Sequence, residues 1–207
     1  MTDETSRQVK GARKPKRRSF YKMDADYVRG GSPGLRLENA DAVKRYLYNW
    51  DGDPYYSQSP EAPRFLFAKK LGRPPRDIEG YVGHWLISDP MKAVLERVDP
   101  TAFGFASCDV ILSDGTAGPR RWLCNVVRTL DALDEQASEF RMFDDAAGKM
   151  YVLTGPTRLI FRDEAVRSAH VFRMKFMEVT IICDQTLKDA CRQVDLKGLS
   201  FVDVGKK

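Results

Sequence analysis

Two stretches of the chain share one order of apolar and polar positions. In residues 81–112, an apolar run ends at Ser88 and Asp89, which have the chemistry of helix N-caps. Apolar side chains then recur at the spacing of one helix face, at Met91, Val94, Leu95 and Val98. The run FGFASCDVIL that follows is typical of a strand. The pattern predicts a strand, a capped helix and a second strand.

Residues 179–204 repeat this order, with the apolar run VTIIC, a capping Asp184, an amphipathic segment and a final strand. Residues 86–89 align with residues 181–184, and a slip of one residue is then needed to align Phe105 with Phe201. Two copies are too few for a solenoid, so the repeat predicts two related units in one domain. Chance recurrence of common capping residues is the alternative.

The other elements that the pattern predicts are short. They include a strand at 20–28, a helix at 41–50 capped by Asn39 or Asp41, and a second element at 64–72 that ends before paired prolines. The turn SDGTAGP joins the strand FGFASCDVIL to a return strand, RRWLCNVVRTL, so the two are expected to form a hairpin. Strand-like runs follow at KMYVL, TRLIF and HVFRM. We therefore predict an α+β fold: one domain with a mixed or mostly antiparallel sheet and a few short helices.

The charged residues divide the chain into a basic N-terminal segment and a neutral remainder. Residues 1–18 contain seven basic and two acidic residues, which accounts for the whole net charge of +5. The remainder keeps 27 of the 34 basic and 27 of the 29 acidic residues, and is neutral. We expect a disordered basic arm at 1–18, an aromatic, turn-rich part of the domain at 19–80 and a core at 81–207. The arm is either a solubilising tail or a segment that touches a partner or nucleic acid.

The chemistry of the sequence argues against catalysis. The four cysteines form no CxxC pair, there are only two histidines, and no nucleotide-binding, hydrolase or metalloprotease motif is present. We therefore expect no enzyme activity, no cofactor and no metal site. A hydrolase using Asp131 and Asp134 is a weak alternative, because nothing supplies a nucleophile or a tuned histidine. No apolar run reaches 18 residues and no secretory signal is present, so we expect a cytoplasmic protein without a membrane span.

Three segments carry a family resemblance, at 85–105, 122–138 and 170–201. The middle segment, WLCNVVRTLDALDEQAS, is the most recognisable, with Trp122, Asn125, Val127, Arg128, Asp131, Ala132, Asp134 and Ser138. Together they resemble a family of bacterial immunity proteins encoded beside polymorphic toxins, long catalogued as a domain of unknown function. Cys183 departs from the serine usual there, which leaves Asp184 to cap alone.

The resemblance implies a non-enzymatic protein that binds and neutralises a cognate toxin. Such toxins are delivered between competing bacteria, for instance by contact-dependent or type VI secretion. The alternative from charge alone is a non-specific nucleic-acid-binding protein that uses the basic arm. Whether the protein forms a homodimer stays open.

Candidate partner-binding residues fall in three places, because interface hot spots favour Tyr, Trp and Arg. They are Trp50, Asp51, Asp53, Tyr55 and Tyr56 in the first, Arg120 and Arg121 in the second, and Asp134 and Glu135 in the third. Trp50 could instead hold its helix to the core, and the arginines could protect a sheet edge from strand pairing. We expect structural roles for the remaining motif residues: Asp89, Trp122, Asn125, Arg128, Asp131 and Asp184. In particular, Arg128, Asp131 and Asp134 could form one charge network.

Overall fold

A computed structural model describes residues 18–47, 61–146 and 148–206. The strands, in chain order, are β1 (Phe20–Ala25), β2 (Leu35–Leu37), β3 (Arg64–Phe67), β4 (Ile78–Tyr81), β5 (His84–Ser88), β6 (Phe103–Leu112), β7 (Arg121–Val126), β8 (Thr129–Leu130), β9 (Arg141–Asp145), β10 (Gly148–Val152), β11 (Val171–Met174), β12 (Met177–Asp184) and β13 (Leu199–Asp203). The helices are α1 (Ala40–Leu47), α2 (Asp89–Val98), α3 (Asp163–Val166) and α4 (Gln185–Gln193), with a 3-10 turn, η2 (Lys69–Leu71).

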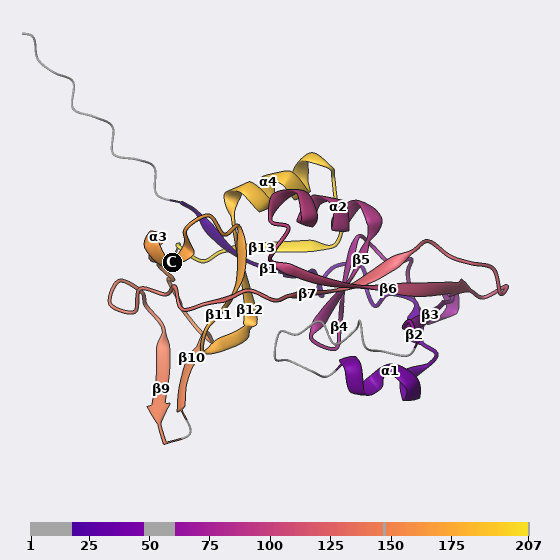
Figure 1. Cartoon of the computed structure of the whole chain (residues 1–207), viewed down its shortest axis with the longest axis horizontal. Coiled ribbons are helices and arrows are strands. Elements are labelled where there is room, and N and C mark those ends of the chain that lie inside the picture. Colours follow the sequence, from indigo (N-terminus) through magenta and orange to yellow (C-terminus); the bar gives the residue numbers. More distant parts are fainter. Residues whose placement is uncertain (1–17, 48–60, 147, 207) are drawn as a thin grey trace, which may run out of the picture.

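The described strands form two mixed sheets and one hairpin (Figure 1). The six-stranded sheet has the order β2-β3-β6-β7-β5-β4, and the five-stranded sheet has the order β13-β1-β12-β11-β8. Neighbouring strands are antiparallel except for β3 with β6 and β8 with β11, which are parallel. The described residues also contain four short α-helices. The architecture is therefore α+β, and the predicted fold class is confirmed.

The predicted repeat is present, and each copy is a split β-α-β unit. In the first unit, β5 and β6 lie on either side of β7 and are antiparallel to it. In the second, β12 and β13 lie in the same way on either side of β1. The helix N-caps are Ser88 and Asp184, so one offset of 96 residues (88 to 184) relates the units. This offset also matches Phe105 with Phe201, and the slip of one residue expected from sequence disappears.

The two units share one hydrophobic core. Helices α2 and α4 lie next to each other above the sheets (Figure 1). Met91 and Leu95 of α2 are buried, and Leu187 and Cys191 occupy the equivalent buried positions of α4. Trp85 from the six-stranded sheet belongs to the same buried cluster. Because both sheets and both helices contribute to this cluster, the described residues form a single domain.

A second core lies on the other face of the five-stranded sheet. Phe20, Phe161 and Phe172 pack edge to face there, with ring centroids 5.0 to 6.3 Å apart. Phe161 belongs to the predicted strand TRLIF, but this segment makes only isolated bridges with the connector before β9, including Leu133 with Phe161. The expectation of a strand at TRLIF is therefore wrong. Its apolar residues are buried by tertiary packing instead.

One further expectation needs correction. The apolar run at 81–88 contains a tight turn, because Val82 and Gly83 have φ of 44° and 75° and join β4 to β5. Asn39 directly precedes α1, as predicted: its backbone carbonyl accepts the Val43 amide at 3.3 Å, and its side-chain Oδ1 accepts the Arg64 amide at 2.9 Å. Among the helices of the described residues, none has the length and apolar character to cross a membrane.

Candidate partner-binding site

The two candidate arginines after the β6–β7 turn lie in different environments. Arg121 is buried, and its guanidinium donates hydrogen bonds to the backbone carbonyls of Arg76 and, at 3.1 Å, Pro75. Arg120 is exposed, with its guanidinium carbon 5.8 Å from the centre of the Trp122 ring. Of this pair, Arg120 alone is placed to meet a partner. Arg121 clamps β7 to the chain before β4.

Trp122 is joined to the start of α2. Its Nε1 donates a 2.6 Å hydrogen bond to Asp89, and Lys92 places its Nζ 4.7 Å from the centre of the indole ring. Asp89 follows the cap residue Ser88, so it occupies the first turn of α2, where a carboxylate is favoured. The structure thus brings together two of the motif residues that the sequence separates by 33 positions.

Arg128 does not form the expected network with Asp131 and Asp134. It binds both carboxylate oxygens of Asp99, at the C-terminal end of α2, and donates to Thr101 at 2.7 Å. Asp99 is buried, and it also accepts the backbone N–H of His170 at 2.8 Å. The ion pair therefore connects the first unit to the strand β11 of the other sheet. The predicted network was wrong because the partner of Arg128 is distant in sequence and only folding brings it near.

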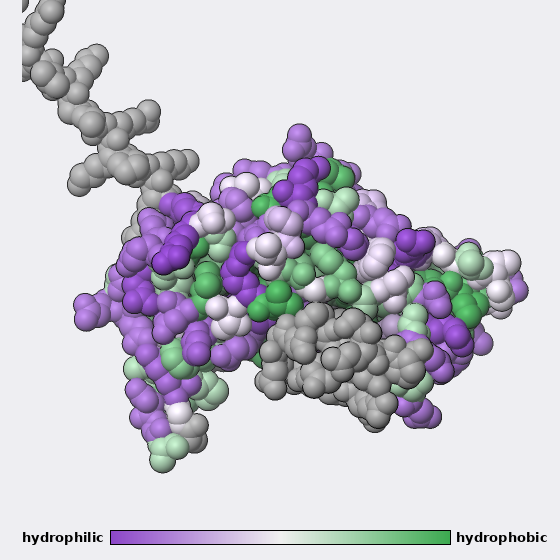
Figure 2. Space-filling model, in the orientation of Figure 1, coloured by the Kyte–Doolittle hydropathy of each residue, from purple (hydrophilic) through white to green (hydrophobic). Residues whose placement is uncertain are grey.

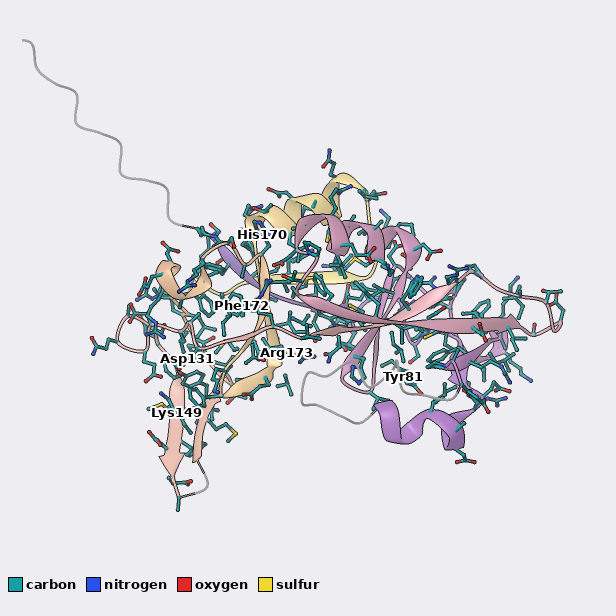
Figure 3. All side chains as sticks on the ribbon, viewed as in Figure 1. Tyr81, Asp131, Lys149, His170, Phe172 and Arg173 are labelled. Carbon is teal, nitrogen blue, oxygen red and sulfur yellow. The ribbon has the colours of Figure 1, made fainter. Side chains whose placement is uncertain are left out.

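Asn125 lies at a second junction between the sheets. Its Oδ1 accepts a hydrogen bond from buried Arg173 on β11. The same guanidinium donates to the carbonyls of Val126 and Glu178, each at 2.6 Å. Figure 3 shows Arg173 between the two sheets. A buried cation with this many oxygen partners holds β7, β11 and β12 in fixed positions.

Asp184 caps α4 and binds Arg18 and His170. Its Oδ1 accepts the Leu187 amide at 3.1 Å, and its Oδ2 accepts hydrogen bonds from Arg18 at 2.8 Å and from His170 Nδ1 at 2.9 Å. Burial acts to raise the pKa of Asp184, but the hydrogen bonds from Arg18, His170 and Leu187 outweigh it, and the pKa lies below 3.8. Arg18, the first described residue, is thereby fixed to the body of the protein.

The connector between β8 and β9 carries the third group of candidates. Asp134 accepts the Ala137 amide at 3.0 Å within a turn, and Asp131 pairs with Arg162 at 3.3 Å. Glu135 binds Lys149 of β10 and accepts a 2.5 Å hydrogen bond from the Tyr151 hydroxyl. The hydrogen bonds from Lys149 and Tyr151 lower the pKa of Glu135.

Glu135 supports a hairpin whose first strand the sequence analysis missed. Strands β9 and β10 pair with each other from Arg141↔Val152 to Asp145↔Gly148, and the hairpin projects from the body (Figure 2). All five side chains of β9 are exposed, so β9 lacks the alternation of apolar and polar positions that marks a half-buried strand. Turn-forming residues between RMF and MYV were the available signal.

The remaining candidates belong to the first of the three predicted groups. Trp50, Asp51, Asp53, Tyr55 and Tyr56 lie outside the described residues, as does the basic arm up to residue 17. In the described part of the chain, no group of three or more His, Cys, Asp or Glu residues is arranged to hold a metal ion. The four cysteines are buried, and burial raises the pKa of Cys108 and Cys191 to about 12.

The contacts above join residues between Arg18 and Leu187, and a single family model covers this part of the chain from Ser19 onward. The model of the Immunity protein family (Imm11) matches residues 19–206. The chain belongs to this immunity protein family. Comparison with curated proteins gives no match.

The family match extends further toward the N-terminus than the predicted core does. The predicted core begins at residue 81, whereas the Imm11 match begins at Ser19 and includes β1 to β4. Strand β1 lies between β12 and β13, so it completes the second split unit. An Imm11 core limited to residues 81–207 would lack that central strand.

Proposed function

We propose that this Imm11 protein binds one cognate antibacterial toxin, made by the same bacterium, and neutralises it by stoichiometric association. The observation that carries the proposal is the family match over residues 19–206. In this proposal the protein acts without catalysis, in the cytoplasm, and protects against a polymorphic toxin delivered between cells, for example by type VI secretion.

The contacts of the motif residues support a scaffold with a separate recognition surface. Asn125, Arg128 and Asp184 are each bound to other parts of the same chain, across or beside the junction of the two units. Their polar atoms are therefore committed to holding the fold. Recognition of a particular toxin then falls to exposed side chains elsewhere, such as Arg120 and those of the connector and hairpin.

The decisive experiment uses the product of the gene next to this one. We expect a tagged full-length chain to co-purify with that product in a fixed ratio, and co-expression to protect bacteria that the toxin alone kills. A complex of this kind should bury more than about 1,000 Å² of surface. Failure of both co-purification and protection would refute the proposed function.

A version lacking residues 1–17 separates this function from the charge-based alternative. Protection should persist in the truncated chain, because the family match begins after the arm. Any nucleic-acid binding by the full-length chain should be strongly salt-dependent and should be lost with the arm. Arg18 stays in the truncated chain, because its guanidinium binds Asp184 at the N-terminus of α4.

A further inference from the structure

The hairpin β9–β10 combines exposed apolar side chains with a firm attachment to the body. Phe143 and Met150 are directly opposite one another on the two strands, and they are 58% and 49% exposed. Met142 on the other face is 43% exposed. Apolar side chains this exposed, gathered at one projecting element, mark an interaction surface more often than scattered ones do.

The base of the hairpin is fixed by Tyr151. Its side chain is 1% exposed, and its ring packs edge to face on Phe140 and Phe176, with centroids 4.9 and 5.6 Å away. The Tyr151 amide also donates a 3.0 Å hydrogen bond to the Phe176 carbonyl. Together with the contacts of Glu135, this anchoring pre-organises the hairpin, which lowers the entropy lost when a partner binds.

The charges near the tip are acidic. Asp144 and Asp145 lie at the end of β9: Asp145 is on the face of Phe143 and Met150, whereas Asp144 is on the other face with Met142, opposite Lys149. The two cations of the hairpin are directed to its base: Lys149 binds Glu135, and Arg141 donates to the Thr154 hydroxyl at 2.6 Å. The end of the hairpin therefore presents carboxylates and apolar groups together, and it complements a positively charged surface that has apolar walls.

The projecting shape of the hairpin is complementary to a concave surface on a partner. Figure 1 shows the hairpin extending away from the two sheets, on the side opposite α4. Among the described strands, β9 pairs with β10 alone, so its outer edge presents backbone N–H and C=O groups. A narrow projection with apolar groups near its end fits into a cleft.

We propose that the β9–β10 hairpin is the element that enters the toxin, and that its site on the toxin is a basic cleft with apolar walls. This inference rests on the proposed function, because it names the surface through which neutralisation takes place. Phe143 and Met150 supply the apolar contact, and Asp144 supplies charge that guides the approach.

The apolar part is tested with Phe143→Ser/Met150→Ser in the full-length chain. Its matched control is Val179→Ser/Val202→Ser, which removes two valines of the body that are 62% and 56% exposed. Binding to the purified product of the adjacent gene is measured by surface plasmon resonance. We expect the hairpin variant to raise Kd about a hundredfold, and the control to change it less than about threefold. Melting temperatures within about 3 °C of the wild-type value confirm that both variants are folded.

The charged part is tested with Asp144→Lys, matched by Asp189→Lys on the exposed face of α4. We expect Asp144→Lys to slow association about tenfold at low salt, with the difference fading at high salt, because steering by exposed charge is screened. Asp189→Lys should leave the association rate nearly unchanged.

Each unfavourable outcome has a distinct meaning. If the wild-type chain binds toxin and both hairpin variants bind as tightly, the hairpin inference is overturned while the proposed function stands. If Phe143→Ser/Met150→Ser instead dissociates a dimer of this chain and leaves toxin binding intact, the hairpin's partner is a second copy, and the inference is likewise overturned. If the wild-type chain does not bind toxin, both the inference and the proposed function fail.

Discussion

Helix α2 of the first split unit begins at Ser88, and helix α4 of the second begins at Asp184, at the equivalent position. The Ser88 hydroxyl accepts the Met91 amide and donates to Asp77 at 2.7 Å. Asp184 accepts the equivalent amide but binds Arg18 and His170 with its second oxygen. The two equivalent helices are thus capped by a neutral hydroxyl in one unit and by a carboxylate in the other. The contributions of the two caps to stability should therefore differ in their dependence on pH.

The far ends of the two helices differ in the opposite sense. Asp99 follows α2, is buried and pairs with Arg128. Its equivalent, Asp195, has φ of 56° and a side chain that is 84% exposed, paired with Lys197. The same residue type at the same position is therefore a buried tie between sheets in one unit and a surface turn in the other.

His170 links the two units across these positions. Its backbone N–H donates to Asp99 at the end of α2, and its ring binds Asp184 at the start of α4. Asp77 makes a similar link, since it accepts from Ser88 and from the Lys197 amide at 2.7 Å. Because the units are joined at their helix ends, a substitution at one cap should change the free energy of unfolding of the whole domain.

The largest expected effect tests the two aspartates at the helix ends. Asp99→Asn leaves the Arg128 guanidinium without its counter-charge, and should lower the free energy of unfolding by about 3 kcal/mol. Asp195→Asn should stay within about 0.5 kcal/mol of wild type, since exposed pairs contribute little. Urea unfolding followed by circular dichroism measures both. Equal losses in the two variants would contradict the assignment of Asp99 as a tie between the sheets.

The next effect tests the charged cap and its pH dependence. Asp184→Asn should cost about 2 kcal/mol near pH 7, because a buried carboxylate that caps α4 and binds the Arg18 guanidinium is lost. The pKa of Asp184 is lowered in the folded protein, so its contribution is complete above the unfolded value of 3.8 and is lost as the pH falls through the folded pKa.

The difference in stability between wild type and Asp184→Asn should therefore shrink below about pH 4, where the unfolded-state carboxyl begins to bind a proton. Unfolding curves collected from pH 7 down to pH 3 measure this difference. A gap that stays constant over the whole range would mean that Asp184 contributes by shape alone.

The smallest effect tests the neutral cap. Ser88→Ala removes the acceptor for the Met91 amide and should cost about 1 kcal/mol. Because the hydroxyl itself does not titrate, the loss should be the same at pH 7 and pH 6. Thermal unfolding at both pH values provides the measurement, and Ser88→Thr, which keeps a hydroxyl, is the control. A loss that depends on pH would remove the contrast between the two caps.

The elements that sequence predicted best are those that local chemistry defines. Ser88 and Asp184 are polar residues between an apolar run and an amphipathic segment, and both are N-caps in the structure. Capping and helix periodicity act over a few residues, so they can be read without knowing the fold. The relation between the units was also visible, although the structure was needed to find its single offset.

The partners of charged residues could not be predicted in the same way. Arg128 was expected to bind Asp131 and Asp134, which are near in sequence, but it binds Asp99, 29 positions earlier. Arg121 was a candidate for the surface, but its guanidinium is buried against backbone carbonyls. A long cationic side chain can reach many acceptors, and only the packing of the sheets determines which of them lies close.

Hairpin β9–β10 shows the same limit for a candidate site. Its first strand lacks the alternation of a half-buried strand, the hairpin contains no functional motif, and its position depends on Tyr151 entering the second core. By itself, the sequence determined the capped helices, the repeat and the location of the basic charge, because each depends on neighbouring residues. Tertiary structure alone decided which charges are buried and which strands project, because these depend on contacts between distant parts of the chain.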